Sequence, residues 1–170
     1  MIRYMNTNFL NSVTNFLKKR TFELIGLMLI FLSIALAISF FTYSPNDPSF
    51  VYGEEKTVIQ NYLGIYGSII SDFLLQSFGL LSFFLTVTIF SWGLNLMFKK
   101  QINQILIKIF FVSLYLIFGC VFVFISFNNS FWLIDNGNSG FVGQSVYDIF
   151  FAYLPGLDSP LQASEFAAQN

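Results

Sequence analysis

Residues 22–41 read FELIGLMLIFLSIALAISFF, and this stretch decides the fold of the chain. Its only charged side chain, Glu23, lies near its start. An α-helix rises about 1.5 Å per residue, so the stretch is long enough to cross the roughly 30 Å hydrocarbon core of a bilayer. Basic residues precede it, as in a signal peptide, but the apolar core of a signal peptide is only about 7–15 residues long. The stretch therefore predicts an uncleaved membrane-spanning helix.

Two further apolar runs are long enough to cross a bilayer. Residues 73–98 and residues 109–127 contain no charged side chain. The chain is 55% hydrophobic and 10% charged, whereas soluble domains are about 45–50% apolar and about 25% charged. Its 24 phenylalanines fall mainly inside the apolar runs and do not alternate with polar residues, as half-buried strands would require. The predicted fold class is all-α, a polytopic helical membrane protein with three spanning helices.

A weak fourth segment, residues 141–154, follows the third span. It contains Gln144 and Asp148 and is followed by Pro155, so we expect an interfacial or half-inserted helix that does not cross alone. Residues 1–21 predict a cytoplasmic segment, either an amphipathic interfacial helix or a disordered tail. The predicted organisation is this N-terminal segment, a transmembrane domain over residues 22–154 and a polar tail over residues 155–170.

Lysine and arginine residues are concentrated on one side of the predicted spans. Seven of the eight lie in the N-terminal segment or between the second and third spans: Arg3, Lys18, Lys19, Arg20, Lys99, Lys100 and Lys108. Basic residues near the ends of spans stay in the cytoplasm. We therefore predict a cytoplasmic N-terminus, with the loops at residues 42–62 and 128–140 outside and the C-terminal tail outside as well.

The sequence offers no catalytic or metal-binding constellation. It contains no G-x-x-x-x-G-K-S/T, H-E-x-x-H or G-x-S-x-G motif, which are typical of nucleotide-binding loops, zinc proteases and nucleophile elbows. It has no histidine and a single cysteine, Cys120, which predicts a packing residue and excludes Cys/His metal sites within one chain. A net charge of −1 shows no basic excess for nucleic-acid binding. We predict no enzyme activity, no cofactor and no direct contact with nucleic acid.

Polar residues near the spans point to packing more than to transport. A transporter usually places ionisable side chains at mid-membrane, whereas Glu23, Asp72 and Lys108 lie at the ends of the runs. Asp72 precedes the second run and predicts a helix cap or an interfacial residue, with a proton relay as the alternative. Gln76 and Asn95 predict hydrogen bonds to neighbouring helices. A small pore or transporter subunit is the alternative function that the residues leave open.

Residues 41–50 read FTYSPNDPSF and resemble the S-P-x-D-P-S-W/F loop that follows the first membrane helix of FtsK/SpoIIIE-type DNA translocases. The matching loop residues are Ser44, Pro45, Asp47, Pro48 and Ser49. Further matches follow in the family's order, in a G-x-x-G…D-x-x-x-Q-x-x-G run, a helix-ending W-G pair and a glycine-rich loop before the fourth helix. These residues are Gly64, Gly67, Asp72, Gln76, Gly79, Trp92, Gly93, Gly140 and Gly143. The resemblance covers roughly residues 22–154.

The resemblance implies a protein of the bacterial inner membrane at the division septum. It implies a membrane anchor and assembly domain that acts in cell division and chromosome segregation, with the bilayer, other divisome membrane proteins and further copies of itself as partners. The loop at residues 44–49 is the expected contact. In the family a fourth helix leads to a cytoplasmic linker and a RecA-like motor, whereas residues 155–170 are polar and no Walker motif is present. We therefore expect a fragment, a frameshifted product or a shortened relative, without ATPase activity.

Overall fold

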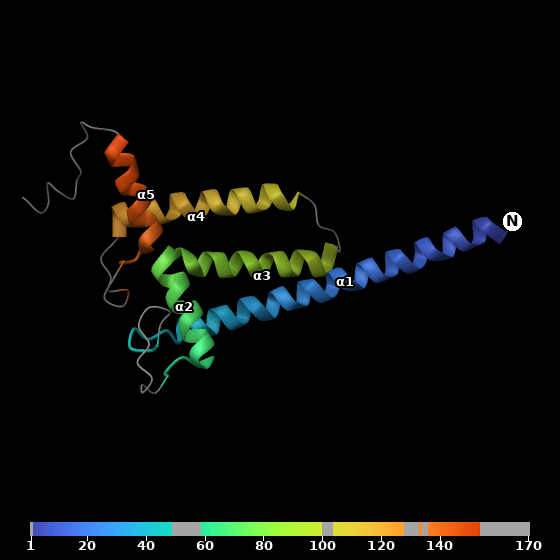
Figure 1. Ribbon diagram of the computed structural model, residues 1–170, viewed down its shortest axis with the longest axis horizontal. Helices are drawn as coiled ribbons and strands as arrows, with labels where there is room; N and C mark the ends of the chain where they lie inside the picture. The colour runs from blue at the N-terminus through green and yellow to red at the C-terminus, as the bar shows by residue number, and fades with distance from the viewer. Residues whose placement is uncertain (1, 49–58, 100–103, 128–132, 134–135, 154–170) are drawn as a thin grey trace, which may run out of the picture.

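The computed structural model describes residues 2–48, 59–99, 104–127, 133 and 136–153. In Figure 1 the longer helices lie side by side, and shorter helices run across one end of them. At the opposite end, the N-terminal part of the first helix extends beyond the others (Figure 1). The described residues form α1 (Ile2–Phe41), α2 (Gly64–Phe78), α3 (Leu81–Lys99), α4 (Ile105–Phe127) and α5 (Gly140–Tyr153). The transverse pair is α2 and α5, and the all-α prediction is confirmed.

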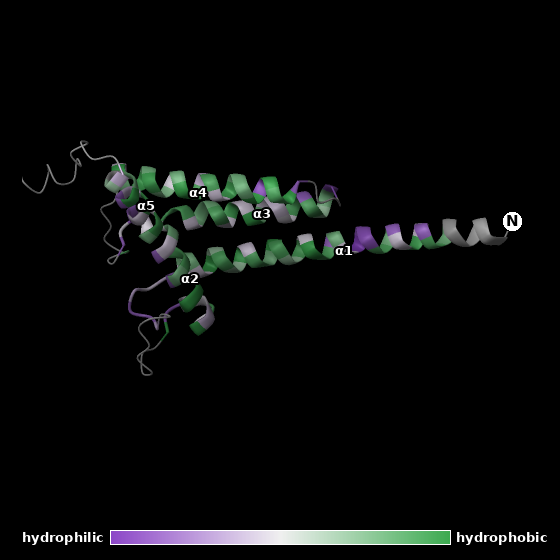
Figure 2. Ribbon diagram, turned by 45° about the horizontal axis from the view of Figure 1, so that its top comes forward, coloured by the Kyte–Doolittle hydropathy of each residue, from purple (hydrophilic) through white to green (hydrophobic). Residues whose placement is uncertain are grey.

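Three helices in the described part of the chain are long and apolar enough to cross a membrane: Phe9–Phe41 within α1, α3 and α4. Figure 2 shows hydrophobic residues along most of these three helices. Many of their large apolar side chains are exposed, among them Phe84, Phe118 and Phe122. Contiguous exposed apolar surface is disfavoured in water, and lipid covers it in a bilayer. The helical membrane protein that the composition predicts is therefore confirmed.

The second span, predicted at residues 73–98, begins in the wrong place. The structure divides this stretch, because α2 ends at Phe78 and α3 begins at Leu81. Between them Gly79 has a φ of 54°, a backbone conformation that glycine adopts far more easily than other residues. The spanning helix is thus α3 alone, and Asp72 lies inside the transverse α2. The prediction that Asp72 caps a helix is therefore wrong.

The other helices also differ from their predicted bounds. α1 begins at Ile2, so the segment before the first span is helical and continuous with it, and the alternative of a disordered tail is not what the structure has. Its 40 residues rise about 60 Å, roughly twice the hydrocarbon thickness. α4 begins at Ile105 and includes Lys108. α5 is a short helix of 14 residues, and the predicted tail at residues 155–170 lies outside the described residues.

A close approach of two backbones joins α1 to α3. A Cβ atom added to Gly26 would lie 2.8 Å from the Gly93 carbonyl oxygen, and one added to Gly93 would lie 2.8 Å from the Gly26 carbonyl oxygen. Small residues allow such close contacts between membrane helices. Gly93 was predicted, together with Trp92, to end a helix, but both lie inside α3. Gly93 instead allows α1 and α3 to approach closely where they cross.

Candidate functional site

Most residues of the predicted motifs meet at one end of the spanning helices. We call this region the end layer; it comprises α2, α5 and the described connections at residues 42–48, 59–63, 133 and 136–139 (Figure 1). Several polar side chains are buried in or against it: Ser39, Asp47, Asn61, Ser68, Ser71 and Ser139. Among the described residues, every buried side-chain nitrogen and oxygen has a hydrogen-bond partner. A stable buried polar layer requires hydrogen-bond partners for its donors and acceptors.

Asp47 fixes the loop after α1 to the segment that leads into α2. Its Oδ1 accepts a hydrogen bond from the backbone N–H of Gln60 at 2.8 Å, and its Oδ2 accepts one from Asn61 at 2.8 Å. The side chain is almost completely buried, at 7% exposed. Hydrogen bonds to a carboxylate are stronger than those between neutral groups. Asp47 therefore acts as the main clamp of this loop.

The remaining loop residues divide between packing and surface. The Pro48 carbonyl accepts a hydrogen bond from the Ser68 hydroxyl at 2.6 Å, which ties the loop to α2. The Ser44 carbonyl accepts the Asp47 N–H at 3.1 Å and closes a turn. Pro45 is exposed, and Ser49 lies outside the described residues. The face of the loop open to a partner therefore lies around Pro45.

Asn61, which carries no motif in the sequence, joins α1 to α2 from the connection between them. Its Nδ2 donates to the Ser39 carbonyl of α1 at 2.9 Å and to the Ser71 hydroxyl of α2 at 3.4 Å. Its Oδ1 accepts the N–H of Leu63 at 3.0 Å. The Ser39 hydroxyl in turn donates to the carbonyl of Gly67 at 2.6 Å, and a Cβ atom at Gly67 would collide with the Asn61 amide oxygen. Gly67 is thus required for the close packing of α1, α2 and Asn61.

A second chain of hydrogen bonds runs from the loop after α1 through α2 to the connection before α5. The Tyr43 hydroxyl donates to Asp72 Oδ1 at 3.1 Å, and Gln76 Nε2 donates to the Tyr43 oxygen at 3.4 Å. Asn136 Nδ2 donates to Gln76 Oε1 at 3.0 Å. Gln76 therefore bonds to two connections, after α1 and before α5, and not to the neighbouring helices as predicted. Asn95 does not bond to a neighbouring helix either, because its amide donates to the Ser91 carbonyl within α3 at 2.9 Å.

Two glycines bring the α2–α3 turn into backbone contact with the start of α5. The N–H of Leu80 donates to the carbonyl of Asn138 at 2.9 Å. A Cβ atom at Gly79 would collide with that carbonyl oxygen, and one at Gly140 would lie 2.6 Å from the Gly79 nitrogen. Gly140 also has a positive φ of 66°. Gly143, one turn later, faces the Cys120 carbonyl of α4, which a Cβ atom there would approach to 2.7 Å.

The structure therefore brings most of the predicted residues together. Asp47, Pro48, Gly67, Asp72, Gln76, Gly79, Gly140 and Gly143 lie in the contacts of the end layer. Gly64 begins α2 with a positive φ of 65° and open space around it, while Trp92 and Gly93 lie apart in α3. Sequence reasoning missed the roles of five residues: Ser39, which lies inside the first apolar run, and Tyr43, Asn61, Asn136 and Asn138, which lie in the loops at residues 42–62 and 128–140. No group of metal-binding side chains occurs among the residues described.

The outer surface of the end layer is rich in aromatic residues. Tyr62 and Tyr66 are 82% and 78% exposed, and Phe73 further along α2 is also exposed. Tyrosine is common at the boundary between membrane and water, where one end of the ring is apolar and the other is wet. This surface has the chemistry of a membrane boundary or of a contact with another protein.

The fold and this layer together define a class of protein. In the described part of the chain, two transverse helices and a hydrogen-bonded polar layer close one end of three spanning helices. This arrangement is that of a polytopic membrane domain that uses its polar residues for packing. Comparison with protein families then gives the particular one: the family described as the 4TM region of DNA translocase FtsK/SpoIIIE matches residues 18–159. The chain belongs to this family, and its location is the inner membrane.

Curated relatives carry the name DNA translocase FtsK. One from Rickettsia typhi is 36% identical over 86 residues, which are 51% of this chain and 11% of the relative. Relatives from Bradyrhizobium diazoefficiens and Brucella suis are each 28% identical, over 135 and 154 residues; these are 79% and 90% of this chain, and 16% and 18% of the relatives. The chain thus spans less than a fifth of the length of these relatives. No solved structure matches it.

Proposed function

We propose that this chain is the membrane anchor and assembly domain of an FtsK-type DNA translocase, and that it acts at the bacterial division site without catalysing a reaction itself. The observation that carries the proposal is the use of the motif residues. Several of them are hydrogen-bonded to other residues of the end layer, as in Asp47 with the backbone of Gln60 and Asn61 and Gln76 with Tyr43 and Asn136. A layer held in this way is suited to present a fixed surface to a partner.

The charge distribution supports an orientation with the end layer outside the cytoplasm. The described part of the end layer contains no lysine or arginine, and it carries Asp47, Asp72 and Asp148. Seven of the eight basic residues of the chain lie in the N-terminal segment or between α3 and α4. Because basic residues remain in the cytoplasm, the N-terminus lies inside. The exposed face around Pro45, Tyr62 and Tyr66 is then available to septal membrane proteins.

The loop face can be tested with a matched pair of substitutions. We expect a fluorescent fusion of the chain to concentrate at division sites, and Asn46→Asp to reduce this enrichment about threefold or more by placing an unpaired charge in the contact. Asn46 and Asn11 are both exposed asparagines, but Asn11 lies on the N-terminal part of α1. Asn11→Asp should leave the enrichment unchanged. Aspartate is chosen because acidic residues have little influence on membrane topology.

An even distribution of the unsubstituted fusion around the envelope would contradict the anchor function. Equal enrichment of the Asn46→Asp and Asn11→Asp fusions would remove the loop face as the contact. The pore alternative makes a different prediction, since vesicles that contain the chain would leak a small fluorescent solute. That leak would disappear in Asp72→Ala or Gln76→Ala.

A further inference from the structure

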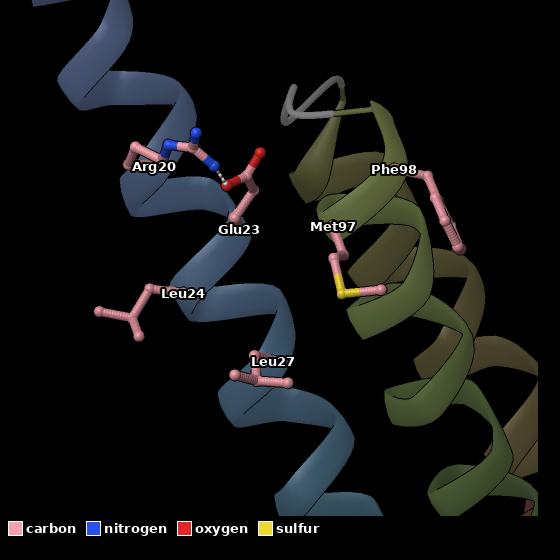
Figure 3. Close-up of a pocket in the computed structure, with 6 residues that line it drawn as sticks. All are labelled: Arg20, Glu23, Leu24, Leu27, Met97 and Phe98. Atoms are coloured by element: carbon pink, nitrogen blue, oxygen red, sulfur yellow. Dashed lines mark hydrogen bonds and ion pairs between the residues drawn. The ribbon is translucent and has the colours of Figure 1, made fainter.

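α1 and α3 enclose an open groove at the end of the molecule that carries the basic residues. The groove has a volume of about 600 Å³ and is lined by Arg20, Glu23, Leu24, Leu27, Met97 and Phe98. The groove lies next to the close contact of the two helices. Met97, one of its lining residues, takes part in that contact, since a Cβ atom at Gly26 would lie 2.8 Å from the Met97 nitrogen. Figure 3 shows the Arg20–Glu23 pair at one end of the groove, with Met97 and Leu27 farther along it. The groove is therefore charged at one end and apolar along its length.

Two contacts hold Arg20 in place at the charged end of the groove. Arg20 Nη1 lies 2.5 Å from Glu23 Oε2, and the Arg20 side chain is 64% exposed. The same guanidinium lies 5.3 Å from the centre of the Phe16 ring. A guanidinium has five N–H donors in a fixed plane, so the contact with Glu23 orients Arg20 and leaves it able to donate to a second anion.

The surroundings of this end favour an anion. Lys19 precedes Arg20, and Lys99 ends α3 directly after the groove residue Phe98. Glu23 is the only acidic residue in the first 46 positions, and residues 73–134 contain none. Basic pockets between membrane helices attract acidic lipid headgroups. A headgroup that also carries an ammonium group would meet these cations with like charge.

We propose that the groove between α1 and α3 binds an anionic phospholipid. Its phosphate contacts Arg20 with support from Lys19 and Lys99, and an acyl chain lies along Leu27 and Met97. The positive charge at one end of the groove matches the phosphate of the headgroup, and the apolar lining along the rest of the groove matches the acyl chain. The site is distinct from the end layer, and it holds whether or not the chain acts at the septum.

The charge of the site is tested on the full chain, purified in detergent micelles and analysed by native mass spectrometry. We expect more bound phosphatidylglycerol than phosphatidylcholine at equal lipid concentrations. Arg20→Gln should weaken phosphatidylglycerol binding about five- to tenfold. Lys108→Gln is the matched control, because it removes a positive charge from the exposed surface of α4 outside the groove. Equal binding by the two variants would overturn the proposal.

The apolar part of the site needs a second pair of variants. Leu27→Trp should fill the groove and reduce phosphatidylglycerol binding while Arg20 remains. Met28→Trp places the same ring on an exposed neighbour that does not line the groove, and it should bind as the original chain does. If Leu27→Trp binds normally and inorganic phosphate displaces the lipid, the groove binds an anion alone and the proposal fails.

Discussion

Replacing Gly79 with alanine should lower the free energy of unfolding by about 3–5 kcal/mol. Gly79 has a φ of 54°, which is strained for any residue with a side chain. The added methyl group would also collide with the Asn138 carbonyl oxygen, so the α2–α3 turn and the start of α5 would have to separate. The loss can be measured by titrating the purified chain with sodium dodecyl sulfate in mixed micelles and following helicity by circular dichroism.

Gly64 provides the matched control for this substitution. It has a similar φ of 65°, but a Cβ atom there would have nothing within 4 Å. Gly64→Ala should therefore cost only the backbone strain, about 1–2 kcal/mol. The difference between the two variants measures the contact with Asn138. Equal losses would mean that the turn and α5 do not touch as the structure has them.

Asp47→Ala should be the second most damaging change, with a loss of about 3 kcal/mol. The carboxylate accepts two backbone hydrogen bonds, both of 2.8 Å, from Gln60 and Asn61. Without it, the buried N–H of Asn61 and the part-buried N–H of Gln60 lose their partners, and the loop after α1 is released from the segment that leads into α2. The same detergent titration measures this loss, and limited proteolysis of the loop gives an independent readout.

Two variants bracket the effect of Asp47. Asp47→Asn retains one acceptor oxygen in the same shape, so it should lose less stability than Asp47→Ala. Asp148→Ala removes an exposed carboxylate of α5 and should change the stability by no more than about 0.5 kcal/mol. An Asp47→Ala variant as stable as Asp148→Ala would show that the carboxylate does not clamp the loop.

The spanning helices could be predicted from the sequence, whereas the break before α3 could not. Apolar runs of sufficient length identify spans because a bilayer demands them. Residues on both sides of Gly79 are apolar, however, so hydropathy continues unchanged through the point where the chain turns. One glycine inside an apolar run is also common in membrane helices. What distinguishes Gly79 is its contact with Asn138, which lies far along the chain, so the local sequence does not show that the chain turns at Gly79.

The residues of the end layer could be predicted only in part. The resemblance to a family pointed to Asp47, Gln76 and Gly140 as members of separate sequence motifs. It did not indicate that these residues lie in one layer. Asn61 and Tyr43 carried no motif, and their importance comes from partners far away in the sequence. Ser39, for example, donates to the carbonyl of Gly67, 28 positions away. Such pairings depend on how α2 crosses the spanning helices, which local sequence patterns do not specify.

Cysteine labelling of intact cells without an outer membrane tests most directly whether the end layer faces the outside. The single native cysteine, Cys120, is buried and can be replaced by alanine. In that background Tyr62→Cys, at a position 82% exposed, should react with a membrane-impermeant maleimide. Asn15→Cys, on the N-terminal part of α1, should react only after the membrane is permeabilised. The reverse pattern would contradict both the orientation and a partner contact at the outer face of the end layer.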